Sequence, residues 1–219
     1  LAGGLGATLW QAREAKREAE RALAARNFMV QLFEASNPDV AQGRTITARE
    51  LLDQGAHQVR SAFPDTPQLR TEMLLLLGDL YLKIGEPESA APLLRQGLAL
   101  AESERDPGLL AQARTGLGLL HSEQGRPAEA IAELEAAASL LTDARRVPGT
   151  EHAHLVHEIG AQMVNLGQAE AAIEYAERAL GFARDRGASE EALFFYLFAL
   201  GNALDMSNSA QSARVDALL

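Results

Sequence analysis

The chain of 219 residues contains no cysteine, and only 5% of its residues are aromatic. The first absence excludes disulfides, thiolate catalysis and thiolate metal sites, and the second argues against a ligand pocket walled by rings. No stretch approaches about 18 consecutive apolar residues, so no segment is expected to span a membrane by itself. Basic side chains are outnumbered, 20 against 30 acidic ones, which gives a formal net charge of −10. Because an acidic surface repels phosphate backbones, no nucleic acid partner is expected.

Hydrophobic residues make up 47% of the chain, and alanine and leucine contribute most of them. These two residue types lose little conformational freedom in a helix. β-Branched residues, which favour strands, are sparse. The composition therefore predicts an all-α fold.

One pattern recurs three times along the chain. It reads LLLGDLYLKIGEPESAAPLLRQGLAL, then GLGLLHSEQGRPAEAIAELEAAASLL, then EIGAQMVNLGQAEAAIEYAERALGFA. The glycines Gly85, Gly125 and Gly167 occupy the same place in each copy and follow one another at 40 and 42 residues. A period of this length is typical of helical repeat proteins.

Each copy predicts two amphipathic helices joined by a tight turn. Gly85, Gly125 and Gly167 end the first helix, where a left-handed conformation is wanted. Pro87 and Pro127 suit the first turn of the next helix. Small residues on both helices are expected to let them approach closely, and large apolar residues to fill the remaining space. The small ones are Gly78, Gly118, Gly160, Ala90, Ala130 and Ala172, and the large ones are Leu77, Leu117 and Ile159.

This arrangement resembles the tetratricopeptide repeat, with a leucine–glycine pair, a turn glycine and then alanines on the second helix. The resemblance covers Thr71 to Arg184 and implies a superhelical stack of antiparallel helix pairs, an α-solenoid. The family's usual repeat has about 34 residues, and the extra residues here fall between the units. The predicted domain of about three full repeats and a partial fourth spans 67–219, with units at 67–104, 108–144, 150–186 and 189–219.

The fourth unit is expected to be incomplete. Leu200, Gly201 and Leu204 stand in the places of the first helix. A weak second helix is expected from about Ser209, either as part of a truncated unit or as a short C-terminal cap.

Two helical segments are expected before the repeats. In TARELLDQGAHQVRSAF, Thr47 and Glu50 form a capping box, and residues 47–66 are predicted to be a half-unit that caps the first repeat. Residues 1–36 contain a predicted long helix over 11–35, about 37 Å in length. Its charged part exposes polar side chains, and its last part, NFMVQLFEAS, is expected to dock on the repeats.

The first ten residues, LAGGLGATLW, carry no charge and end in the only tryptophan, Trp10. The end of a transmembrane helix with an interfacial tryptophan has this composition. A disordered or capping start to a soluble helix has it as well, and the residues alone leave both interpretations open.

Three runs in the N-terminal third carry a second resemblance: LWQAREAKREAERA, FMVQLFEASNPDVAQG and TITARELLDQGAHQV. Through Leu9–Gln11, Leu32–Pro38 and Thr47–Gly55, they resemble the bacterial membrane-bound, eukaryotic-like serine/threonine kinases that carry C-terminal tetratricopeptide repeats. In that class a kinase domain precedes one transmembrane helix, then a linker, then the repeats. The resemblance implies a regulatory segment of a membrane-anchored serine/threonine kinase.

The kinase motifs themselves are absent from the sequence. It has no glycine-rich nucleotide loop followed by a lysine strand, and no HRD-type or DFG-type triplet. LAGGLG at the start lacks both a preceding strand and the required spacing. We therefore predict that this chain is not an enzyme and that it has no cofactor.

The membrane side is predicted from two signals that conflict. By the resemblance, the repeats lie on the extracytoplasmic (periplasmic) side of a bacterial inner membrane, which is the side we favour. The cytoplasmic side is the alternative, because basic flanks of apolar segments usually stay inside. The basic residues that follow the apolar start are Arg13, Lys16, Arg17, Arg21 and Arg26.

The run EHAHLVHE brings three histidines together at a helix start, His152, His154 and His157. His154 and His157 lie three residues apart on one helix face and are weak candidates for sharing a metal ion. Solvated or groove-lining histidines are the favoured interpretation. We therefore predict no metal site and keep a His-based metal sensor as a weaker alternative.

Stacks of this kind bind partners on the concave surface that the first helix of each pair lines. Projecting each first helix from its leucine–glycine pair turns Tyr81 and Leu204 to the core and predicts a mixed, mildly acidic groove. That groove comprises Glu72, Leu75, Asp79 and Leu82; Gln112, Thr115, Leu119 and Ser122; His154, His157, Ala161 and Val164; and Phe195, Phe198, Asn202 and Asp205. A protein or peptide ligand with apolar anchors and some positive charge fits it.

The predicted function is therefore a sensor or scaffold domain that binds a protein or peptide and regulates an attached kinase. The alternative is a structural dimerisation module that forms a homodimer through the N-terminal helix. Small and apolar residues follow steps of three and four along that helix, as in a coiled-coil seam. They are Ala12, Ala15, Ala19, Ala22, Met29 and Phe33, with Arg26 as the one interruption.

Overall fold

A computed structural model describes residues 16, 19–20, 22–28, 30, 47–142 and 148–216 of the chain. The described residues between 16 and 30 are helical, and no strand occurs anywhere in the described part. The labelled helices are α2 (Ala48–Ala62), α3 (Pro67–Lys83), α4 (Pro87–Glu104), α5 (Pro107–Glu123), α6 (Pro127–Leu141), α7 (Thr150–Asn165), α8 (Ala169–Asp185) and α9 (Glu190–Asp216).

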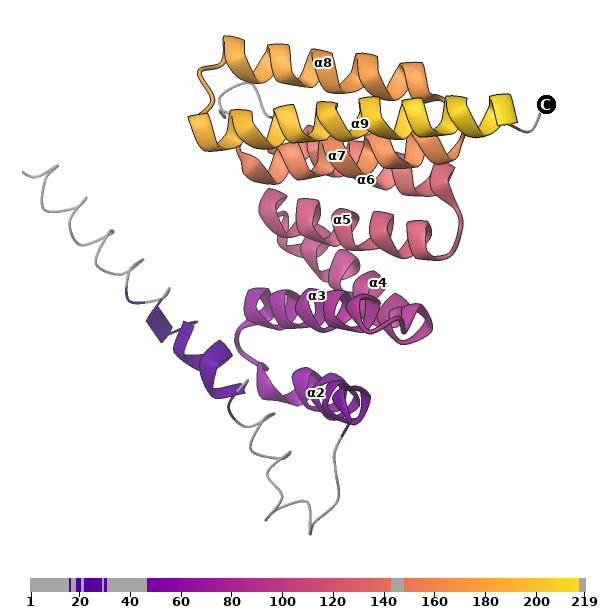
Figure 1. The fold of residues 1–219 in the computed structure, drawn as a ribbon. Helices are drawn as coiled ribbons and strands as arrows, with labels where there is room; N and C mark the ends of the chain where they lie inside the picture. The colour runs from indigo at the N-terminus through magenta and orange to yellow at the C-terminus, as the bar shows by residue number, and fades with distance from the viewer. Residues whose placement is uncertain are drawn as a thin grey trace, which may run out of the picture.

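The helices form consecutive antiparallel pairs. The pairs α3–α4, α5–α6 and α7–α8 follow one another along the stack, with α2 at one end and α8 and α9 at the other (Figure 1). Neighbouring first helices touch at both ends of the stack, where α3 contacts α5 and α7 contacts α9. The predicted all-α solenoid of helix pairs is confirmed.

The turns inside the pairs form as the sequence predicts. Gly85, Gly125 and Gly167 have φ angles of 74°, 68° and 75°, in the left-handed region. At Gly85, the next residue's N–H donates to the Tyr81 carbonyl at 2.9 Å, and Gly85 N–H itself donates to Leu82 at 2.9 Å. These two bonds satisfy carbonyls that the end of α3 would leave free.

Leucines and glycines hold the first two pairs together. A Cβ added to Gly78 would lie 2.6 Å from Leu94 Cδ2, and one added to Gly118 would lie 2.6 Å from Leu134 Cγ. Such distances leave no room for a side chain at either glycine. The predicted close approach of helices is therefore confirmed in the first two pairs.

The third pair departs from this prediction. A Cβ added to Gly160 would meet nothing within 4 Å. The reason lies on α8, where Ala176 occupies the place that Leu94 and Leu134 hold in the earlier pairs. An alanine is too short to reach over the glycine, so the prediction of a close contact at Gly160 is wrong.

The core is divided along the stack. One buried cluster extends from α2 to α5, a second joins α6 to α7, and a third joins α7, α8 and α9. The first cluster includes Phe28, which is 3% exposed and whose ring centroid lies 5.4 Å from that of Phe63. The predicted helix over 11–35 lies mostly outside the described residues, but Phe28 fixes its described part to α2.

Helix α2 is capped and tied to α3 by polar contacts. The predicted capping box is confirmed, because Glu50 N–H donates to Thr47 Oγ1 at 3.2 Å and Thr47 N–H to Glu50 Oε2 at 2.9 Å. Tyr81 is 2% exposed, and its hydroxyl donates to Asp53 Oδ1 at 2.6 Å. Burial raises the pKa of that hydroxyl, so the phenol stays a donor.

The C-terminal end differs from the prediction in two ways. Helix α9 continues without a break to Asp216, whereas a separate second helix was expected from about Ser209. Leu204, predicted to face the core, is 44% exposed. The second difference follows from the first, because no second helix comes after α9 within the described residues to cover Leu204.

Candidate functional site

The predicted groove residues lie on the first helices α3, α5, α7 and α9, and all but one keep exposed surface. The exception is Leu75, which is 2% exposed. A Cβ added to Gly97 on α4 would lie 2.4 Å from its Cδ2, so Leu75 packs against the paired helix. The prediction that Leu75 lines a groove is therefore wrong.

Four of the predicted residues come together between α7 and α9, and we call them the His–Phe patch. The ring centroid of His154 lies 4.7 Å from that of Phe195, and the His157 centroid lies 5.7 Å from that of Phe198. Phe198 is 53% exposed and His154 is also exposed, while the other two rings are half-buried. Aromatic side chains held in place by their neighbours are common centres of protein interfaces.

The patch rests on a buried polar pair that ties the same two helices together. His152 Nδ1 and Tyr196 Oη lie 2.5 Å apart, and the two side chains are 7% and 0% exposed. Burial lowers the pKa of His152 to about 4 and raises the pKa of the Tyr196 hydroxyl. Both groups are therefore neutral at pH 7, and the pair holds Phe195, next to Tyr196, against α7.

The two remaining predicted residues on α9, Asn202 and Asp205, continue along the helix from the patch. They follow Phe195 by seven and ten residues, so the three share one helix face. Asp205 is exposed and Asn202 half-buried. On α7, Ala161 and Val164 extend the opposite side in the same direction, which gives the patch a polar and acidic end on α9.

The predicted residues on α3 and α5 form a more polar area. Asp79 pairs with Lys83 at 2.7 Å on the same helix, and the Thr115 hydroxyl donates to the Ala111 carbonyl at 2.8 Å. Ser122 accepts a hydrogen bond at 2.8 Å from Gln162, which is 5% exposed, and so links α5 to α7. Glu72, Leu82 and Leu119 are half-buried, and Gln112 is exposed.

His154 and His157, the weak metal candidates, pack against aromatic rings. Among the described residues no group of three or more histidine, cysteine or carboxylate side chains could hold a metal ion. His154 and His157 each lie against a phenylalanine ring instead. This geometry assigns the two histidines to an aromatic surface.

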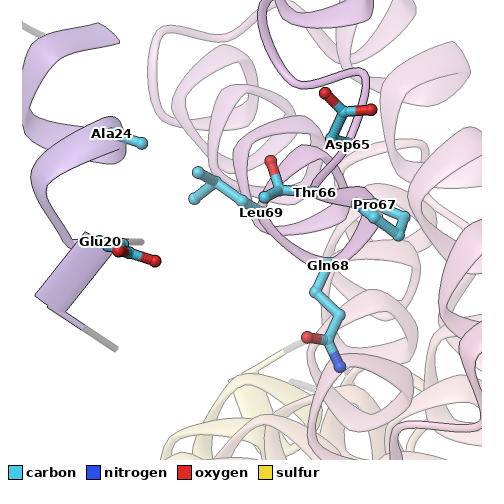
Figure 2. Close-up of a pocket in the computed structure, with 7 residues that line it drawn as sticks. All are labelled: Glu20, Ala24, Asp65, Thr66, Pro67, Gln68 and Leu69. Carbon is cyan, nitrogen blue, oxygen red and sulfur yellow. The ribbon is translucent and has the colours of Figure 1, made fainter. Parts of the chain in front are cut away.

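A pocket of about 290 Å³ lies at the other end of the stack. Figure 2 shows Glu20 and Ala24 of the N-terminal helical segment on one side of it, and the start of α3 on the other. Asp65 and Glu20 contribute the carboxylates, and no basic or aromatic side chain lines it. The two carboxylates make the pocket unfavourable for an anion. The pocket lies where the N-terminal helical segment meets the start of α3.

The predicted dimer seam of the N-terminal helix falls largely outside the described residues. Of its members, Ala19 and Ala22 are described, and both are exposed, as is Arg26. No helix in the described part is both long enough and apolar enough to cross a membrane.

A family model described as tetratricopeptide repeat matches residues 70–143, which span α3 to α6. Residues 70–143 are thus similar to the tetratricopeptide-repeat family. Such domains mediate protein–protein contacts and are typically non-catalytic scaffolds, in keeping with a surface of packed helices. The α7–α9 end of this domain, which carries the His–Phe patch, lies beyond the matched residues.

Two solved structures share the fold over most of the chain. The nearly identical TPR-like repeats of a Podosopora anserina protein assigned to the kinesin light chains give a TM-score of 0.61 at 19% identity, covering 86% of this chain and 89% of that chain. BtubC (BKLC) from P. vanneervenii gives 0.59 at 15% identity, covering 90% and 85%. At such identities the likeness shows the fold alone.

A third solved structure is a much longer protein. It is a Signal Transduction ATPase with Numerous Domains from Pyrococcus horikoshii that has a tetratricopeptide-repeat sensor. Its TM-score is 0.59 at 15% identity, covering 88% of this chain and 30% of that chain. No curated protein matches the sequence of the chain.

Sequence reasoning missed the His152–Tyr196 pair. Tyr196 is equivalent by repeat position to Met73, Ala113 and Leu155, all of which are buried. A buried tyrosine needs a partner for its hydroxyl, and this requirement was the available signal. The repeat pattern gave no signal for His152 as that partner, because the equivalent positions hold Arg70 and Leu110 and neither pairs with a tyrosine in its own repeat.

Proposed function

We propose that the domain binds a protein or peptide on its first-helix face, with the His–Phe patch as the centre of the contact. The single observation that carries the proposal is the paired packing of His154 on Phe195 and His157 on Phe198. The pairs fix the rings before any partner arrives, which reduces the entropy lost on binding.

The chemistry of the face specifies the partner. Phe198, 53% exposed, offers an apolar contact and a ring face for a cation. Asp205 lies on the same face of α9, and the chain as a whole carries a net charge of −10. A peptide that combines an aliphatic or aromatic anchor with lysine or arginine is therefore the expected ligand.

We further propose that the domain is the sensor or scaffold part of a bacterial membrane-anchored serine/threonine kinase, on the extracytoplasmic side. The resemblance of Leu9–Gln11, Leu32–Pro38 and Thr47–Gly55 to that class supports this, and so does the sensor role of the tetratricopeptide repeats in the Pyrococcus protein. In this arrangement the domain binds and the attached kinase catalyses.

A peptide library displayed on phage tests the binding surface. Panning on the immobilised domain should enrich peptides that carry an apolar residue near a basic one. The double variant Phe195→Ala, Phe198→Ala should bind these peptides much more weakly than the unmodified domain, and its circular dichroism should show the same helical content. Phe182→Ala on α8, away from the patch, is the matched control and should bind like the parent. Equal enrichment on the double variant would place the binding surface elsewhere.

The kinase context has its own test. The coding sequence upstream of Leu1 should encode an apolar span of about 20 residues and, before it, the glycine-rich, HRD and DFG motifs of a kinase. A protease-protection assay on cells then reports the membrane side of the domain. Upstream sequence without these motifs would refute the kinase proposal and leave peptide binding untouched.

A further inference from the structure

The outer face of α9 carries a row of apolar residues that no described residue covers. We call it the α9 row, and its members are Phe194, Leu197, Gly201 and Leu204. The three large side chains are 63%, 48% and 44% exposed, and Gly201 is exposed as well. Their spacing of three, four and three residues sets them in one line along the helix, as in a coiled-coil seam. Helix α9 is the last described helix and packs on α7 and α8 at one end of the stack (Figure 1).

Within the described residues the fold gives no reason for a glycine at position 201. Gly201 lies inside α9, where glycine destabilises a helix relative to alanine. A Cβ added to it would meet no described atom within 4 Å. The equivalent glycines of the first two repeats each lie under a leucine of the antiparallel helix beside them, Gly78 under Leu94 and Gly118 under Leu134. The exposed glycine therefore indicates a leucine from a further antiparallel helix.

The α9 row is symmetrical about Ala199. Phe194 and Leu204 stand five residues before and after Ala199, and Leu197 and Gly201 stand two residues before and after it. A second α9 helix can be placed antiparallel to the first, related to it by a two-fold axis at the level of Ala199. In this arrangement Leu197 of each copy lies over Gly201 of the other, and Phe194 of each lies beside Leu204 of the other. Every residue of the row then meets a described residue.

We propose that two copies of this chain dimerise through their α9 rows, with the two α9 helices antiparallel. The contact of Leu197 with Gly201 repeats, between copies, the leucine–glycine packing found inside the first two helix pairs. The second copy's α9 has the direction of the second helix of a pair, because the helices of each pair are antiparallel. The row contains no charged side chain, so the contact places no charge in the seam.

The α9 row and the His–Phe patch share no residue. Dimerisation therefore goes beyond the proposed peptide binding, and either can fail while the other stands.

Paired cysteines test the register, because the chain has none of its own. Phe194→Cys and Leu204→Cys, mixed under reducing conditions and then mildly oxidised, should give a disulfide-linked dimer of one chain of each kind. Either variant alone should stay unlinked. The two copies of one position lie ten residues apart along the antiparallel helices, about 15 Å, which a disulfide does not span. Linked dimers of a single variant, or no linked dimer in the mixture, would overturn the proposal.

Filling the glycine tests the contact itself. Light scattering of the unmodified chain should give twice the mass of one chain. Gly201→Leu should halve that mass without loss of helical content, because the new side chain takes the place of Leu197 of the other copy but has no described neighbour at its Cβ in its own chain. A dimer that survives Gly201→Leu would overturn the proposal.

A charge in the row provides a second variant with a matched control. Leu197→Glu should give a monomer, whereas Leu166→Glu, at 41% exposure against 48% for Leu197, should stay dimeric. A parent chain that is monomeric across a concentration series would also overturn the proposal, and the row would then be a surface for a helix of another protein.

Discussion

The two ends of the stack are built from the same helix pair but are packed with different side chains. In α3–α6, long leucines reach over glycines, as Leu94 does over Gly78 and Gly116, and Leu134 over Gly118. In α7–α9, Ala176 stands in the leucine's place, and the buried His152–Tyr196 pair joins the helices instead. The family model matches 70–143, where the leucine contacts are. The α7–α9 end therefore keeps the helix arrangement of the repeat, but a buried polar pair replaces the leucine contacts there, and the same two helices carry the His–Phe patch on their surface.

The largest expected effect comes from removing one of the leucines that pack over glycines in α3–α6. Leu94 is 1% exposed, and Leu94→Ala would leave space beside both Gly78 and Gly116. We expect a loss of about 2–5 kcal/mol in the free energy of unfolding, measured by urea denaturation. An unchanged midpoint would show that this leucine does not hold the two pairs together.

Overpacking the same end should have the next largest effect. Ala130 is 0% exposed with its carbonyl close to Gly118. Ala130→Phe should cost about 1–3 kcal/mol because the helices must move apart. Ala171→Phe on the exposed face of α8 is the control and should leave the melting temperature nearly unchanged. Equal melts for Ala130→Phe and the parent would refute the repeat register.

A pH-dependent effect should be confined to the α7–α9 end. The pKa of buried His152 is lowered to about 4 from its usual 6.5. Between pH 6.5 and 4 the unfolded chain therefore binds a proton at His152 that the folded chain does not bind. The contribution of His152 to the free energy of unfolding is complete above pH 6.5 and is lost as the pH falls toward 4. Hydrogen exchange should show α7 and α9 opening first on acidification. His152→Gln should flatten this dependence, and His154→Gln, on the exposed side, should not.

The smallest effect distinguishes two equivalent glycines. Gly160→Ala should stabilise the domain by about 0.5–1 kcal/mol, because alanine favours the helix interior and its Cβ would meet nothing within 4 Å. Gly118→Ala should destabilise, because its Cβ would lie 2.6 Å from Leu134 Cγ. Thermal melts of the two variants that shifted in the same direction would remove the distinction between the ends.

The features that the sequence predicted correctly depend on local chemistry. The left-handed Gly85, Gly125 and Gly167 are fixed by backbone sterics within one turn. The capping box of Thr47 and Glu50 spans only three residues. Such signals are complete within a short stretch of chain, so they survive whatever packs around them.

The errors arose where burial depends on another helix. Leu75 is buried because Gly97 lets α4 come close, and Leu204 is exposed because no second helix follows α9. The pairing of His154 with Phe195 depends on the register between two helices about 40 residues apart. The repeat pattern placed these two rings on one face, but only the structure brings them into contact.

The link between Gln162 and Ser122 has a mechanical consequence. It joins α5 to α7 by one hydrogen bond of 2.8 Å where the leucine contacts give way to alanine packing. A hydrogen bond loses its strength over a short extension, whereas interdigitated leucines resist separation through many weak contacts. The buried cluster of α6 and α7 lies beside this bond, so loss of the bond would loosen the contact between α5 and α7 while the cluster kept the two parts of the stack joined.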